Sequence, residues 1–477
     1  MQFWKHYRIP LCLFIVSLIT YYLFAYQLVR TDYPTLIILY TLLWLVFLLL
    51  MTYAKTNFKF LTVIAFLSRA IFILAIPNLS QDFYRFIWDG RMLLQGFNPY
   101  LFTPESFISI GKLPIAQAME LYEGMGQLNG SHFSNYPPIK QFCFTIAALC
   151  SGQSILGSAI VFRVIIIAAD FGTFFFGRKL LQQLHLSERN IFWYLLNPFI
   201  IIELTGNLHF EGVMIFFLIW SLYLLHCGKW KWAAVIFACS ISVKLIPLLF
   251  LPLLYRCFVT NSATTSIDIT NKKTKFSVLK GMKTLLSFYV IVGITTLLLF
   301  APFFSSEFIN NYAQTIALWF NNFEFNASIY YLARAIGYWL TGYNEIAIIG
   351  KILSILVFLF VMGLAFLRRT PDTKQLITNM LFAFGIFLFL STTIHPWYLA
   401  TLLILSVFTN YKFPLVWSFV IILSYLAYLN PNQADKSENL WIIALEYAIV
   451  YVVFIWEVFF FKRFQQKRKA NSSELAS

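Results

Sequence analysis

Charged residues are scarce in this chain of 477 residues, of which only 12% are charged and 60% are hydrophobic. Soluble globular domains carry roughly 25% charged residues, so this chain has too few of them to cover a surface exposed to water. Its repeated apolar runs of about 20 residues are long enough to cross a roughly 30 Å hydrocarbon core. The alternating segments of a membrane β-barrel do not occur. The composition therefore predicts an all-α polytopic membrane protein.

The chain also has few residues of the kinds that form crosslinks or metal sites. Its six cysteines all lie in or beside apolar segments, so no disulfide framework is expected. It contains no CxxC or HExxH motif. The opening MQFWKHYRIP is basic, but the apolar run after it is long and lacks a small-residue cleavage site. We therefore expect a retained first helix and not a cleaved signal peptide.

The basic residues follow the topology of a membrane protein. We predict about 12 to 14 transmembrane helices, and most of the 35 Lys and Arg then fall in loops on one side. The positive-inside rule makes that side cytoplasmic, together with the N- and C-termini. This distribution explains the net charge of +15, so we expect membrane lipids and no nucleic acid as partners.

The expected organisation is one integral membrane domain over residues 1–477 with two large outer loops that carry short amphipathic helices. The first outer loop covers 80–156, the second covers 304–344, and a polar cytoplasmic loop covers 256–283. Two apolar segments allow two interpretations. Either 138–152 is re-entrant and 232–256 is a bent pair of short helices, or 138–152 is a full span and 232–256 a single one. The first interpretation is favoured because it places the basic stretch 178–190 inside.

One stretch, SQDFYRFIWDGRMLLQGFNPY (80–100), gathers charges directly after an apolar run. If it is helical, Asp82, Arg85 and Asp89 stand at i, i+3 and i+7, on one stripe of the helix. We expect an amphipathic helix at the outer membrane surface. A carboxylate held beside an Arg at that boundary is a candidate general base. The alternative is a structural ladder of salt bridges.

The longer run SRAIFILAIPNLSQDFYRFIWDGRMLLQGFNPY resembles the first-loop signature of the GT-C superfamily of integral-membrane glycosyltransferases. It is most similar to polyprenol-phosphate-mannose-dependent α-mannosyltransferases and more distantly similar to GPI-anchor mannosyltransferases. The resemblance covers about residues 68–400. It continues, in order, through SNYPPIKQ, NPFIIIELTGNLHFEG, SVKLIPLLFLPLL, FNASIYYLAR and HPWYLA.

The resemblance implies a GT-C-like enzyme that moves a hexose, with mannose expected, from a polyprenyl-phosphate sugar to a lipid- or glycan-linked acceptor. The active site would face outward from the bacterial cytoplasmic membrane, with a first-loop Asp as general base. Many members carry two acids at this place, as DxD or an adjacent pair, whereas this chain has Gln81 and then Asp82. Asp82 is therefore the expected base, with Asp89 as a second catalytic candidate. No cofactor is expected, and the absence of DxD argues against a divalent metal.

The leaving group in such a reaction is a lipid phosphate, which gains charge in the transition state and is stabilised by fixed cations. Candidate phosphate ligands are Arg85, Lys244, Arg334 and His395. Candidate substrate contacts are Arg91, Tyr136, His209 and Glu211.

Each of these residues also has a structural alternative. Lys244 could snorkel or pair with Asp170 or Glu203, and His395 could belong to an interfacial aromatic belt. His209 and Glu211 could form a plain polar turn. For Arg69, Arg163 and Asp170, which lie within spans, mutual pairing is the favoured interpretation.

Two other functions compete with glycosyl transfer. A flippase or transporter of lipid-linked saccharides would place charges deep in its spans and show inverted repeats, but no repeat is found. A polymerase or ligase of surface polysaccharide would also carry a large outer loop with basic residues. The six ordered motifs favour the glycosyltransferase.

Overall fold

The structure is a computed structural model that describes residues 2–54, 57–259, 271–321, 323–368, 370, 372–428 and 438–460. Helices account for 78% of it. The described ranges contain no β-strand apart from an isolated bridge between Phe325 and Thr393. The predicted all-α polytopic membrane fold is therefore confirmed.

Fewer of the described helices are long and apolar enough to span a membrane at full length than the 12 to 14 that we expected. Seven described helices are long and apolar enough to cross a membrane, or eight when a bent pair is counted as one span. Four further apolar helices are shorter, at 230–241, 246–259, 396–407 and 413–426. The difference arises because hydropathy measures how apolar a segment is and does not reveal where its helix breaks.

The chain begins with three helices and then enters the first predicted outer loop. The first three are α1 (Gln2–Tyr26), α2 (Tyr33–Tyr53) and α3 (Phe58–Ala70). The loop contains α4 (Asp82–Leu94), α5 (Pro104–Ile108), α6 (Ala118–Gly130) and α7 (Pro138–Ser151). With 14 residues, α7 is about 21 Å long, which is shorter than the hydrocarbon core.

The central part of the chain is built around a sharply bent span. It consists of α8 (Ile155–Gln183), η1 (Glu188–Ile191), α9 (Phe192–Leu195), α10 (Pro198–Ile200), the π-helix η2 (Ile201–Gly206), α11 (Glu211–His226), α12 (Trp230–Ile241), η3 (Ile246–Leu253) and α13 (Leu254–Val259). The segment 198–206 meets α11 at 114°. Lys244 falls in the break between the short apolar helices α12 and η3.

The remaining helices form the second predicted outer loop and the C-terminal spans. They are α15 (Asn271–Phe300), η4 (Ala301–Phe303), α16 (Ser306–Asn321), α17 (Ile329–Thr341), α18 (Ile346–Phe366), α19 (Thr373–Leu390), η5 (Pro396–Tyr398), α20 (Leu399–Val407), α21 (Phe413–Val420), η6 (Ile421–Tyr428), α22 (Leu440–Ile455) and η7 (Trp456–Phe460). Of the predicted cytoplasmic loop 256–283, residues 260–270 lie outside the described residues, and α15 is already helical from Asn271.

A buried arginine stabilises the bend. Arg163 of α8 donates hydrogen bonds to the carbonyl oxygens of Thr205 and Gly206, each at 3.1 Å. These carbonyls lie where the helix breaks and would otherwise lack partners in an apolar environment. Arg69 pairs with Asp170 at 2.6 Å, and both side chains are fully buried. The predicted pairing of buried charges is thus confirmed for Arg69 and Asp170, whereas Arg163 binds backbone oxygens instead.

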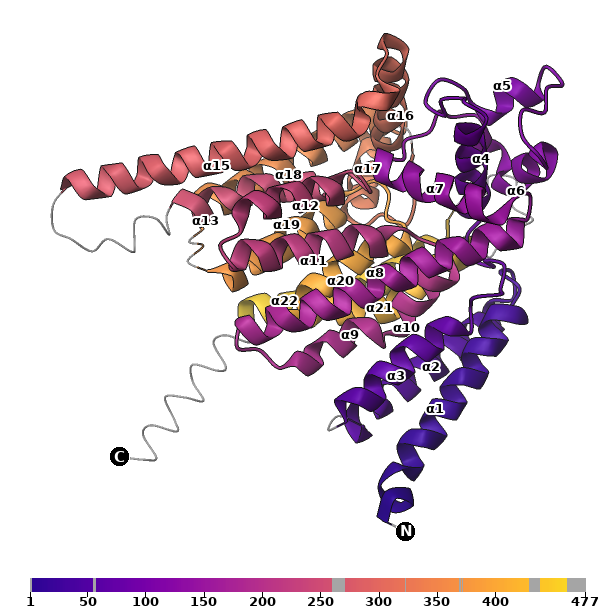
Figure 1. Cartoon of the computed structure of the whole chain (residues 1–477), viewed down its shortest axis with the longest axis horizontal. Helices are drawn as coiled ribbons and strands as arrows, with labels where there is room; N and C mark the ends of the chain where they lie inside the picture. The colour runs from indigo at the N-terminus through magenta and orange to yellow at the C-terminus, as the bar shows by residue number, and fades with distance from the viewer. Residues whose placement is uncertain are drawn as a thin grey trace.

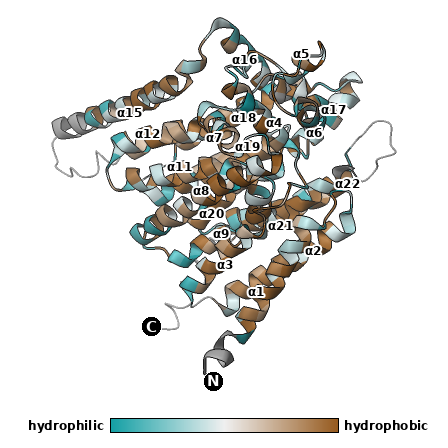
Figure 2. Cartoon of the chain, turned by 45° about the vertical axis from the view of Figure 1, so that its right-hand side comes forward, coloured by the Kyte–Doolittle hydropathy of each residue, from teal (hydrophilic) through white to brown (hydrophobic). Residues whose placement is uncertain are grey.

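The helices of both predicted outer loops lie at the same end of the molecule. In Figure 1, α4 to α7 and α16 gather on the right, whereas α15 begins at the far left. Figure 2 shows hydrophobic residues along the lengths of the helices and hydrophilic residues mainly near their ends and in the connections. This end of the molecule carries the polar residues that line the cavity described next.

Candidate active site

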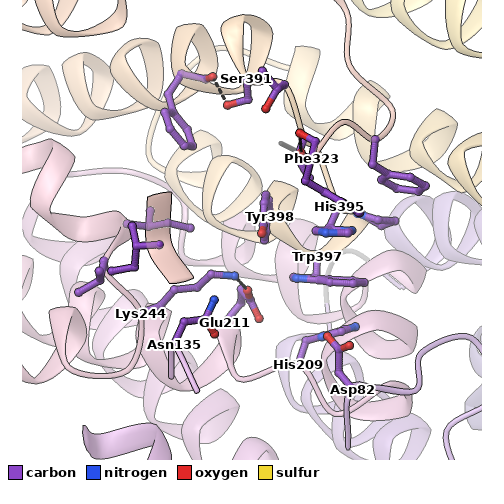
Figure 3. A pocket seen from close by; sticks show the side chains of 18 of the residues that line it. Asp82, Asn135, His209, Glu211, Lys244, Phe323, Ser391, His395, Trp397 and Tyr398 are labelled. Atoms are coloured by element: carbon purple, nitrogen blue, oxygen red, sulfur yellow. Dashed lines mark hydrogen bonds and ion pairs between the residues drawn. The ribbon is translucent and has the colours of Figure 1, made fainter. Parts of the chain in front are cut away.

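A cavity of about 800 Å³ opens where the first predicted outer loop, the bend before α11, the α12–η3 break and the turn η5 meet. Six of the ten predicted site residues line it: Asp82, Tyr136, His209, Glu211, Lys244 and His395. These residues are far apart in the sequence, so the fold gathers them. Figure 3 shows Asp82 near His209, and Lys244 near Glu211 and Tyr398.

Asp82 is the first residue of α4 and keeps part of its surface exposed. The amide Nδ2 of Asn129 in α6 donates a hydrogen bond of 3.3 Å to its Oδ1. Desolvation by the surrounding protein raises the pKa of the Asp82 carboxyl, and the positive charge of Lys140 and the Asn129 hydrogen bond oppose this shift. A carboxylate with a raised pKa is a better proton acceptor once it is ionised.

Lys244, in the break between α12 and η3, forms an ion pair with Glu211 at the start of α11. The Lys244 ammonium lies 4.1 Å from the centre of the Tyr398 ring. The partners that sequence reasoning considered for Lys244 are engaged elsewhere: Asp170 pairs with Arg69, and Glu203 accepts a hydrogen bond from the Tyr425 hydroxyl. Lys244 is therefore a cavity residue with an acidic partner of its own.

Three aromatic rings form a stack along the cavity wall. The ring of Trp397 lies 3.7 Å from the His209 ring and 4.6 Å from the His395 ring, measured between centroids. Figure 3 shows this stacking of Trp397 and His395. Desolvation lowers the pKa of His395 to about 3. The His395 ring is therefore neutral near pH 7 and can offer a phosphate a hydrogen bond but no positive charge.

Arg85 and Asp89 were predicted for phosphate binding and catalysis, but they do not line the cavity. Arg85 turns along α4 and pairs with Asp89 at 2.8 Å, and both side chains are almost fully buried. Arg85 also donates to the carbonyl oxygens of Asn129 and His132. Asp89 accepts a hydrogen bond of 2.9 Å from Gln141 in α7. This pair joins α4 to its neighbours. Its role is thus the structural salt bridge that was the alternative interpretation of the charges in 80–100.

Arg91 and Arg334 also lie away from the cavity lining. Arg91 donates to the carbonyl oxygen of Ala116 at 2.7 Å. Arg334 forms an ion pair with Glu324 and lies 4.4 Å from the centre of the Tyr331 ring. Each is engaged within its own predicted outer loop.

Lys140 is the main cavity residue that sequence reasoning missed. It lies in the first turn of α7, lines the cavity, and is only 7% exposed. The sequence did carry a signal, because Lys140 is the basic residue of SNYPPIKQ at the start of an apolar segment. An ionisable residue in such a segment suggests function by default.

The comparison with known families agrees with this arrangement. A family model described as alpha-(1->6)-mannopyranosyltransferase, N-terminal domain, matches residues 23–260. The chain belongs to this GT-C type mannosyltransferase family. The matched region includes Asp82, Lys140, Glu211 and Lys244, whereas His395 lies beyond it. A search of curated proteins gave no match.

The mannosyltransferase cavity has an apolar part beside its charged residues. Four small residues at i, i+4, i+7 and i+11 of α18 line it in a stripe along one helix face, and only the second of them has a polar side chain: Gly350, Ser354, Val357 and Val361. Leu248 and Leu249 of η3 and Phe384 and Phe387 of α19 complete this surface. The stripe covers about 16 Å along α18, at 1.5 Å per residue. Such a cavity suits a ligand with a polar head and a long apolar chain.

Proposed function

We propose that this membrane mannosyltransferase transfers mannose from a polyprenyl-phosphate donor to a lipid- or glycan-linked acceptor on the outer face of the bacterial cytoplasmic membrane. The observation that carries the proposal is the cavity itself, which joins a carboxylate and two lysines to an apolar stripe on a transmembrane helix. A nucleotide-sugar donor would have no use for the apolar stripe. A polyprenyl chain would bury its own apolar surface there.

In the proposed reaction Asp82 is the general base. The acceptor hydroxyl attacks C1 of the sugar and gives its proton to the Asp82 carboxylate. The bond between C1 and the phosphate oxygen breaks, and its electron pair leaves with the phosphate. Attack from the side opposite the phosphate inverts the configuration at C1. Asn129 holds the carboxylate through the hydrogen bond to Oδ1.

We assign the leaving phosphate to Lys244 and His395, because both line the cavity beside the apolar stripe. Lys244 supplies a positive charge, which stabilises the charge that develops in the transition state. His395, as a neutral ring, supplies a hydrogen bond. Tyr136, His209 and Glu211 contact the sugar or the acceptor, and Glu211 also fixes the position of Lys244. Arg85 and Asp89 support α4 and do not take part in the chemistry.

The proposed orientation places this cavity outward and the basic stretch 178–190 in the cytoplasm. The main support is the positive-inside rule applied to the loops. In addition, both outer loops contribute to the cavity, through Asp82 and Tyr136 of the first and Phe323 of the second. An outward site meets a donor in the outer leaflet directly.

Transfer in isolated membranes tests this function. Membranes that express the chain should move radiolabelled mannose from polyprenyl-phosphate-mannose to an endogenous acceptor, with the product identified by mass spectrometry. Membranes that express the Asp82→Asn variant to the same level serve as the control. Transfer from a nucleoside diphosphate-mannose in the absence of any polyprenyl phosphate would contradict the proposed donor.

A further inference from the structure

Lys140 occupies an aromatic cage at the cavity. Its Nζ lies 4.1 Å from the centre of the Tyr136 ring and 4.5 Å from that of Phe86. The centres of the Phe210 and Phe144 rings lie 5.7 Å and 5.9 Å from the same Nζ. Ring faces attract a cation, most strongly when it has lost its water. The cage therefore holds the ammonium at a defined place at the edge of the cavity.

The two lysines of the cavity differ in their partners. Lys244 has an acidic partner in Glu211. In the described part of the chain no carboxylate lies within ion-pairing distance of Lys140, and no acceptor receives a hydrogen bond from its Nζ. A buried ammonium without a counter-ion is costly, and an ionisable residue kept at such a cost indicates a functional site.

Charges from several elements surround Lys140 at longer range. Burial lowers its pKa to about 8, the carboxylates of Glu211, Asp82 and Asp89 act to raise it, and the positive charge of Lys244 acts to lower it. Asp82 and Asp89 belong to α4, Glu211 begins α11, and Lys244 lies between α12 and η3. The side chain is therefore mainly protonated at neutral pH. A further anion in the cavity would hold it in that form.

We propose that Lys140 is a ligand of the donor phosphate and stabilises that group as it leaves. This inference rests on the proposed polyprenyl-phosphate donor. Such a donor is a phosphodiester with one negative charge. When the bond from C1 to the phosphate oxygen breaks, the electron pair stays on that oxygen, the acceptor oxygen bonds to C1, and the acceptor proton goes to Asp82. The departing monoester has gained one negative charge, which the Lys140 ammonium balances.

The position of Lys140 suits this role. The helix α7 that carries it packs against α4, which carries Asp82. The same lysine lowers the pKa of Asp82 through its charge, although no hydrogen bond joins them.

Two other roles of Lys140 make different predictions. A purely structural lysine would only hold the aromatic rings, and a lysine that only tunes Asp82 would not affect affinity for phosphate.

Binding of a water-soluble short-chain polyprenyl phosphate separates these roles. The full-length protein is purified in detergent as wild type, Lys140→Gln, Lys140→Arg and Lys140→Met. Lys179→Gln is the matched control, because Lys179 also lies over a ring, 4.2 Å from the centre of Phe175, but does not line the cavity. The uncharged polyprenol of the same length is the reference ligand.

We expect Lys140→Gln and Lys140→Met to weaken binding of the polyprenyl phosphate on the order of 10- to 100-fold. Their binding of the polyprenol should stay within about twofold of wild type. Lys140→Arg should retain most of the affinity for phosphate, and Lys179→Gln all of it. The Met side chain is similar in volume to that of Lys and fills the cage, so we expect at least Lys140→Met to fold. A cooperative thermal unfolding transition checks this.

Equal phosphate affinity in wild type and in a folded neutral variant would overturn the assignment of Lys140. Equal losses for the phosphate and the polyprenol would also overturn it, because the lysine would then be structural. If the wild type itself binds no polyprenyl phosphate, the proposed donor fails, and this inference fails with it for that separate reason.

Discussion

Asp82 combines three features of a general base: a partly exposed carboxylate, a place at the cavity, and a pKa raised by desolvation. Its position in the first turn of α4 also places the carboxylate near the positive end of the helix dipole, which favours the ionised form. The other carboxylates near the cavity lack this combination. Glu211 is committed to Lys244 and Asp89 to Arg85. The residue that remains available for an acceptor hydroxyl is Asp82.

Replacing the carboxylate of Asp82 should therefore remove the chemistry and leave the protein intact. We expect Asp82→Asn to insert normally and to lower mannosyl transfer by about 10²- to 10⁴-fold, the usual cost of losing a general base. Transfer is measured in membranes with matched protein levels. Glu123→Gln, which changes an exposed acid of α6, is the control and should keep wild-type transfer. Asp82→Asn activity above a few per cent would remove this residue from the role of base.

The charges of Asp82 and Lys140 predict how activity depends on pH. Asp82 acts in its ionised form, so transfer should fall as the pH drops through its raised pKa. Lys140 acts in its protonated form, so transfer at low donor concentration should fall as the pH rises through about 8. In Lys140→Arg the alkaline fall should disappear, because a guanidinium stays charged in this range. Values of kcat/KM, obtained from initial rates between pH 5 and 10, test both the acid and the alkaline fall. An unchanged alkaline fall in Lys140→Arg would contradict the role of Lys140.

At the scale of elements, the site depends on the close approach of α4 and α7. Gly90 of α4 faces the backbone of α7, where an added Cβ would lie 2.3 Å from the carbonyl oxygen of Phe144. The rings of Phe86 and Phe144 stack across the same contact with centroids 4.7 Å apart. Because α4 carries Asp82 and α7 carries Lys140, the packing at Gly90 sets how the two charges lie relative to each other.

A methyl group at Gly90 should therefore disturb both stability and activity. We expect Gly90→Ala to destabilise the protein by about 1–3 kcal/mol, as overpacking of a core does, and to lower transfer. Thermal unfolding in detergent measures the first effect and the membrane assay the second. Gly293→Ala in α15 is the matched control, since an added Cβ there meets no atom within 4 Å. If both variants unfold at the same temperature, the contact is looser than this distance implies.

At the scale of the whole molecule, the proposed topology requires the stretch 178–190 and the first outer loop to lie on opposite sides of the membrane. Ser187 and Ser109 are exposed residues of these two segments. In a cysteine-free background, a membrane-impermeant thiol reagent added to intact cells should label Ser109→Cys and leave Ser187→Cys unlabelled. Permeabilised cells should label both. Labelling of Ser187→Cys from outside would reverse the orientation and turn the cavity away from the outer face.

The sequence alone determined the class of the protein, and it led to the prediction of Asp82 as the base. The scarcity of charge and the apolar runs predict a polytopic helical membrane protein, because burying charge in lipid is costly whatever the fold. The charge pattern of 80–100 and its ordered companion motifs led to the family, which the family model confirms. Helix α4 could be predicted because periodicity is a local property of the chain, and the single acid after Gln81 selected Asp82 as the expected base.

Only the tertiary structure decided which charged side chains meet. Arg85 and Asp82 share a stripe of α4, yet Arg85 binds Asp89 and the carbonyl oxygens of α6 and the loop that follows it. Lys244 pairs with Glu211, which is 33 residues away in the chain. Lys140 lines the cavity because α7 packs against α4. The short and broken spans likewise became visible only in the fold. The physical reason is that transfer of a segment into lipid depends on its own composition, whereas an ion pair or an aromatic cage depends on which distant segments pack together.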